Sequence, residues 1–120
     1  MNRLILPGIA GLIALMAAGC GSSSNPANPS PQATNVSIVL NSQNLTTTAY
    51  NPNPVTIARG GTVMWVNNDT IPHTSTADGG LWNSGNLAAG ASFSMTFPNT
   101  GSFPYHCTLH PGMVGTVNVQ

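Results

Sequence analysis

The residues most able to do chemistry lie close together near the end of the chain. The stretch PYHCTLHPGM, residues 104–113, holds one cysteine, two histidines and one methionine. A thiolate, imidazoles and a thioether can ligate a metal ion, and a cysteine near a histidine can act as a nucleophile with its base. The cluster could also arise by chance, or the cysteine could form half of a disulfide.

A cysteine nucleophile and a zinc site both fit the rest of the chain poorly. A Cys–His nucleophile needs a third group to orient the base and donors for an oxyanion. The only carboxylates are Asp69 and Asp78, and neither has an evident relation to Cys107. Zinc prefers several thiolates, or histidines with carboxylates. A single thiolate, two imidazoles and a distant thioether are instead the ligand set of an electron-transfer copper centre.

The segments that must position these residues are predicted to be strands. Period-two patterns rich in β-branched and aromatic residues recur along the chain, and clusters of Gly, Pro and Asn between them are turn signals. We predict about seven or eight short strands in an all-β, antiparallel sandwich or barrel. The clearest candidate strands are residues 36–40, 54–58, 62–67, 91–97, 101–107 and 113–119.

Strand alternation separates the two histidines of the reactive stretch. If Phe103 and Tyr105 face the interior, Cys107 does so too. His106 then faces outward and cannot share an ion with the cysteine beside it. The chain has three histidines, so the second imidazole beside His110 must come from His73.

Two segments resemble the cupredoxins, the small blue-copper proteins of the plastocyanin and amicyanin kind. They are VNND-x2-PH at residues 66–73 and GSFPYHCTLHPGMVGTVNV at residues 101–119. The resemblance covers residues 36–120, and the C-x2-H-x2-M spacing is closest to amicyanin. It implies a Greek-key β-sandwich or barrel that binds one copper ion, alternating between Cu(I) and Cu(II). The implied ligands are His73, Cys107 and His110, with Met113 in the axial position.

The resemblance also implies roles for the neighbours of the ligands. The residue after the first histidine, here Thr74, would donate its backbone N–H toward the thiolate, although asparagine is commoner there in the family. Asn67, like Thr74, would stabilise the ligands through contacts from outside the ligand set. His110 would be the electron port to transient redox partners, within a patch formed by Ile71, Pro72, Leu109 and Pro111. Relatives have a longer segment between His73 and Cys107, which leaves the loops of residues 76–90 unassigned.

The leading hypothesis is therefore a single-electron carrier that is not an enzyme. The alternative is a carrier or sensor that handles copper itself, although such proteins often expose several methionines. Nitrite reductases and multicopper oxidases need further histidine sets, which the chain lacks. Charged residues make up only 3% of the chain, so no basic patch exists for nucleic acid. We expect a monomer.

The first 35 residues predict export and a tether. Residues 1–19 combine Arg3, an apolar run and small residues, as signal peptides do. Cys20 follows directly, as in bacterial lipoproteins, although Ala17 stands where leucine is usual. A lipidated Cys20 would hold the protein at a membrane in the periplasm or on the cell surface, whereas ordinary cleavage would leave it soluble in the periplasm. Residues 20–35, rich in Ser, Pro and Asn, would form the linker.

The disulfide interpretation depends on the same cysteine. The chain has only two cysteines, Cys20 and Cys107. A bridge between them requires Cys20 to be retained without lipid, and it would join a linker to the domain. If Cys20 carries lipid, Cys107 is a lone thiol in an oxidising compartment, which favours a metal ligand.

Overall fold

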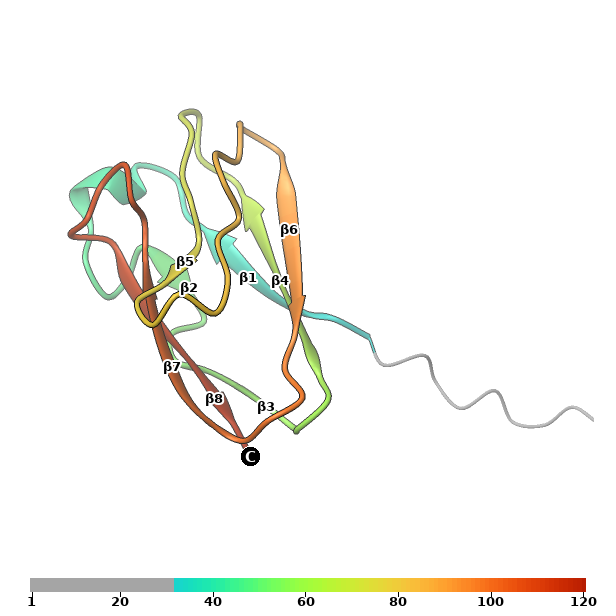
Figure 1. The fold of residues 1–120 in the computed structure, drawn as a ribbon. Coiled ribbons are helices and arrows are strands. Elements are labelled where there is room, and N and C mark those ends of the chain that lie inside the picture. The colour runs from blue at the N-terminus through green and yellow to red at the C-terminus, as the bar shows by residue number, and fades with distance from the viewer. Residues whose placement is uncertain (1–31) are drawn as a thin grey trace, which may run out of the picture.

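Two four-stranded sheets pack face to face in the computed structural model, which describes residues 32–120 (Figure 1). One sheet has the order β2-β1-β4-β6 and the other β3-β8-β7-β5. These eight strands confirm the predicted β-sandwich. The strands are β1 (Thr34–Ile38), β2 (Tyr50–Asn51), β3 (Val55–Ile57), β4 (Thr62–Asn67), β5 (Thr76–Ala77), β6 (Ser92–Thr96), β7 (Gly101–His106) and β8 (Val114–Val119), and the one helical turn among the described residues is the 3-10 turn η1 (Ser42–Asn44).

The antiparallel pairing expected from the sequence holds for four strand pairs, but two pairs are parallel. Strand β1 runs parallel to β4, and β3 runs parallel to β8, while the other neighbours are antiparallel. A period of two shows which face a side chain occupies but carries no information on strand direction. Parallel partners need a long crossover connection. The segment between β1 and β4 supplies one, because it crosses to the other sheet to form β3 on the way.

Most strand bounds agree with the sequence pattern within two residues. The run 62–67 coincides with β4, whereas β1 begins at Thr34, inside the range expected to be linker. The pattern missed β2 and β5, which contain two residues each. Among residues 32–120, no helix is long and apolar enough to cross a membrane. The predicted signal peptide, Cys20 and most of the linker lie outside the described residues.

An aromatic cluster fills the space between the sheets. Trp65 of β4 is fully buried, stacks on Trp82 with ring centroids 5.5 Å apart, and meets the edge of Tyr105 at 5.4 Å. Trp82 reaches the core because residues 78–81 form a turn, with Gly80 at a φ of 82° and the N–H of Ala77 bonded to the carbonyl of Trp82. Residues 76–90, whose loops the sequence left unassigned, thus fold back and cover one flank of the core.

The register of β7 and β8 produces the loop that carries the reactive residues. Tyr105 pairs with Gly115 and His106 with Val114, so residues 107–113 connect the two strands at one end of the sandwich. Figure 1 shows this red loop beside the cyan-green turn η1 at the same end. The N–H of Val114 bonds to the carbonyl of Thr46, just beyond η1, and ties the two segments together.

Candidate metal centre

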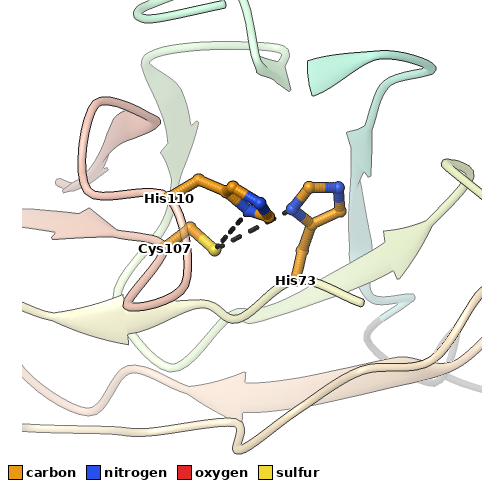
Figure 2. A group of neighbouring side chains, drawn as sticks. All are labelled: His73, Cys107 and His110. Atoms are coloured by element: carbon orange, nitrogen blue, oxygen red, sulfur yellow. Dashed lines mark hydrogen bonds between the residues drawn. The ribbon is translucent and has the colours of Figure 1, made fainter. Parts of the chain in front are cut away.

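Three donor side chains from two loops meet at this end of the sandwich. The ligating atoms of His73, Cys107 and His110 all lie within 4.8 Å of one another. Figure 2 shows the sulfur of Cys107 facing a nitrogen of each imidazole. The Sγ–Nδ1 distance is 3.8 Å to His73 and 3.8 Å to His110. No other group of three His, Cys, Asp or Glu side chains in residues 32–120 has this spacing.

The sulfur of Cys107 is enclosed and held from the backbone. The side chain is fully buried, and the N–H of Thr74 lies 3.3 Å from Sγ as a donor. Thr74 also accepts a hydrogen bond on its hydroxyl from the N–H of Thr108, at 2.9 Å. These contacts connect the two ligand loops directly.

The loop of residues 107–113 is closed by its own backbone. The N–H of Cys107 donates to the carbonyl of Met113 at 3.1 Å, and the N–H of Met113 donates to the carbonyl of His110 at 2.9 Å. Met113 is fully buried at the end of this loop. The cysteine, the histidine and the methionine of the C-x2-H-x2-M motif are thus positioned by one tight turn between β7 and β8.

The backbone holds His73 from the opposite side. Its backbone N–H and carbonyl form hydrogen bonds with the backbone of Leu87, at 3.1 and 2.8 Å. The segment of residues 76–90 therefore holds the histidine in place. Asn67, at the end of β4, donates its side-chain amide to the carbonyls of Ile71 and Leu87, at 2.8 and 2.9 Å. Asn67 is fully buried, and these bonds fix the loop that leads to His73.

A buried carboxylate lies behind His73, and the sequence pattern did not identify it. Oδ2 of Asp69 is 2.8 Å from Nε2 of His73, on the side of the ring away from Cys107. Burial raises the pKa of Asp69, but hydrogen bonds from His73, Thr70, Asn41 and Ser42 outweigh burial and hold this pKa well below its usual range. Asp69 is therefore an ionised carboxylate only 4% exposed. A His–carboxylate contact of this kind orients metal-binding histidines in many proteins.

His106 lies outside the donor group, as strand alternation predicted. Its ring is half-buried and contacts the carboxylate of Asp78, the residue that follows β5. The predicted port residues form the outer rim of the site. His110 and Ile71 are partly exposed, while Pro72, Pro111 and Leu109 are exposed, Leu109 by 45%.

The donor set suits copper better than the alternatives. Metal bonds of about 2.0–2.3 Å to one centre place trigonal donors about 3.5–4 Å apart, which agrees with the two Sγ–Nδ1 distances of 3.8 Å. One thiolate with two imidazoles matches the trigonal set of blue-copper sites, and a thiolate favours Cu(I) while imidazoles accept both oxidation states. Asp69 contacts His73 and would orient it as a base, but Cys107 is fully buried and its sulfur also faces the imidazole of His110, which fits a metal ligand better than a nucleophile.

Comparison with known proteins finds similarity to copper proteins. Residues 36–120 match the family described as copper binding proteins of the plastocyanin/azurin family. The chain is 35% identical over 71 residues to amicyanin from Paracoccus versutus, across 55% of this chain and 54% of that protein. It is 37% identical over 84 residues to plastocyanin from Scenedesmus fuscus, across 59% of this chain and 86% of that protein. It therefore spans about half of the amicyanin and most of the plastocyanin.

Solved structures share the fold. A purple cupredoxin from Nitrosopumilus maritimus has a TM-score of 0.67 at 32% identity, covering 72% of this chain and 99% of that chain. A copper-containing nitrite reductase from Thermus scotoductus SA-01 has a TM-score of 0.63 at 23% identity, over 75% of this chain and 23% of that one. At that identity the nitrite reductase indicates a common fold alone.

Proposed function

Because this chain belongs to the plastocyanin/azurin family of copper-binding proteins, we propose that it is a small electron carrier with one copper ion. His73, Cys107 and His110 would hold the ion, with Met113 as the axial ligand. The observation that carries the proposal is one buried cysteine sulfur facing two imidazoles, with their donor atoms within 4.8 Å. Copper bound there supplies a one-electron couple between Cu(I) and Cu(II).

The protein around the donors limits rearrangement during electron transfer. Cys107, His73 and Met113 are fully buried, so water has little access from the core side. Backbone bonds to Leu87, Thr74 and within the loop hold the donors in one arrangement. A site fixed in this way changes little between the two oxidation states, which favours fast transfer over substrate chemistry. We therefore propose a carrier and not an enzyme.

His110 would be the port through which electrons leave. It is the only donor with partial exposure, and its rim of Ile71, Pro72, Leu109 and Pro111 carries no charge. An uncharged apolar patch suits brief contact with redox partner proteins, and the chain offers no basic surface for nucleic acid.

Electron exchange should depend little on salt. The described residues carry one arginine, Arg59, and two aspartates, of which Asp69 is buried, so electrostatic steering is weak. The self-exchange rate, measured by NMR line broadening of mixed Cu(I) and Cu(II) protein, should change less than about threefold from low to high salt. A Leu109→Glu variant should exchange more slowly at low salt and recover as salt rises. A steep salt dependence of the wild-type rate would contradict the uncharged port.

A redox titration of the copper-loaded protein distinguishes the carrier of electrons from a carrier or sensor of copper. We expect one equivalent of copper, an intense visible band in the oxidised form, and reversible one-electron reduction with the metal retained. A colourless protein that binds only Cu(I) and gives it up to a competing chelator would support copper handling instead.

We further propose that the protein is exported and monomeric, and that only a lipid on Cys20 holds it at the membrane. Export and the lipid anchor are supported by the order of the N-terminal sequence: signal-like residues 1–19, then cysteine, then a Ser/Pro/Asn-rich linker. In cell fractionation, wild-type protein should sediment with membranes and Cys20→Ala should become soluble. Equal release of both proteins would argue against lipidation.

A further inference from the structure

Asp69 and His73 form a hydrogen-bonded pair, which places a buried carboxylate next to one of the three donor side chains. Asp69 stands four residues before His73, and its Oδ2 is 2.8 Å from Nε2. The backbone N–H of Asp69 donates to Oδ1 of Asn67 at 2.9 Å, so the end of β4 fixes the start of this turn. The carboxylate can accept hydrogen bonds but cannot donate them while ionised.

Further donors surround the carboxylate. The N–H groups of Asn41, Ser42 and Thr70 reach it at 3.1, 3.2 and 2.8 Å. The Ser42 hydroxyl lies 3.2 Å from Oδ2 and can donate to it. Asn41 and Ser42 belong to the segment at η1, 27 residues or more from Asp69 in sequence. One distant segment and the turn that follows β4 therefore hold this carboxylate in place together.

This arrangement fixes which nitrogen of His73 carries the proton. Because Asp69 only accepts, Nε2 must carry the hydrogen and donate it to Oδ2. Nδ1 is then left with its lone pair, and Nδ1 is the atom that faces Cys107 at 3.8 Å. The partner of the second ring nitrogen selects the tautomer of a metal-binding histidine.

The carboxylate also changes the charge balance of the buried site. Among residues 32–120 the only arginine or lysine is Arg59, whose backbone N–H donates to the carbonyl of Gln120, and this C-terminus lies at the opposite end of the sandwich from the ligand loop (Figure 1). The Cys107 thiolate and Asp69 each contribute one negative charge. Cu(II) balances the two, whereas Cu(I) leaves one buried negative charge uncompensated, and such a charge is costly.

We propose that Asp69 is a positioning residue of the copper centre. It holds the Nδ1 lone pair of His73 toward the metal and favours Cu(II), which lowers the reduction potential. The inference rests on the proposed copper centre.

The test compares Asp69→Asn with Asp78→Asn in the copper-loaded protein. Asp78 is the matched control, because it also contacts an imidazole, that of His106, but outside the donor group. Asp69→Asn should shift the Cu(II)/Cu(I) equilibrium about tenfold toward Cu(I), a rise in potential of about 59 mV. Asp78→Asn should shift it less than about twofold, since its contact is largely exposed to solvent.

Two measurements keep the proposal open to refutation if Asp69→Asn does not fold. Nitrogen-15 NMR of the wild-type metal-free and Cu(I) forms should show the proton of His73 on Nε2. Ser42→Ala removes one donor from the carboxylate and should shift the equilibrium about twofold in the opposite direction, toward Cu(II), because the negative charge is less neutralised. A proton on Nδ1 in the metal-free form, or equal potentials for Asp69→Asn and Asp78→Asn, would overturn the role of Asp69. A wild-type protein that forms no coloured centre would instead overturn the proposed function.

Discussion

Replacing Cys107 by Ser should abolish the intense visible band of the oxidised, copper-loaded protein. The band requires charge transfer from a thiolate to Cu(II), and Cys107 is the only cysteine among the described residues. A serine hydroxyl stays protonated at neutral pH and is a poor ligand for copper. Copper affinity should fall by more than about 100-fold, beyond the loss typical of removing a residue that only supports a ligand. Absorption spectra and competition with a copper chelator measure both effects.

His106→Gln is the matched control for this variant. His106 adjoins Cys107 in sequence, yet its ring contacts Asp78 and not the donor group. The control should keep the visible band and bind copper within about threefold of wild type, because it leaves the donors unchanged. Circular dichroism should show that both variants remain folded. A Cys107→Ser protein that stays coloured, or a His106→Gln protein that loses its colour, would refute the assignment of the donors.

The donor group could be predicted because reactive side chains are rare in this chain. Because the chain has only three histidines, the alternation along β7 was enough to exclude His106 as a ligand beside Cys107. His73 was then the remaining candidate for the second histidine ligand. The structure brings together the donor atoms of three of the four predicted ligands and buries the fourth, Met113, at the end of the ligand loop. The prediction needed only the residue types and the two-residue period, which depend on local sequence.

Asp69 could not be found in this way, because its contacts depend on distant segments. A carboxylate and a histidine four positions apart form a side-chain pair in a helix, but here the segment is a turn. The position of Asp69 depends on η1, whose Ser42 is 27 residues away. The pairing of β1 with β4 is similar, since strand direction depends on how the chain crosses between the sheets. Neither the position of Asp69 nor the strand direction can be predicted from local sequence patterns.

Replacing Gly115 by Ala should destabilise the domain by about 3 kcal/mol, at the upper end of overpacking costs. A Cβ at this position would lie 2.4 Å from Cζ and 2.5 Å from the hydroxyl oxygen of Tyr105. The Tyr105 ring cannot withdraw easily, because it is 1% exposed and packs against Tyr50 at 4.8 Å and Trp65 at 5.4 Å. Urea unfolding of the metal-free protein measures the loss.

The same substitution should disturb the metal centre, because this cross-strand pair sets the ends of the ligand loop. Tyr105 precedes Cys107 by two residues and pairs with Gly115, which follows Met113 by two. A forced separation of β7 and β8 there would shift the loop that carries three donors, so the visible band should move or weaken. Gly112→Ala is the control, since a Cβ at Gly112 meets no atom within 4 Å, and it should cost less than about 0.5 kcal/mol. Adding Tyr105→Leu to Gly115→Ala should cost less than the sum of the two single changes, because the shorter side chain removes the clash. Equal stability of the Gly115→Ala and Gly112→Ala proteins would show that the β7–β8 pair tolerates a side chain at this position.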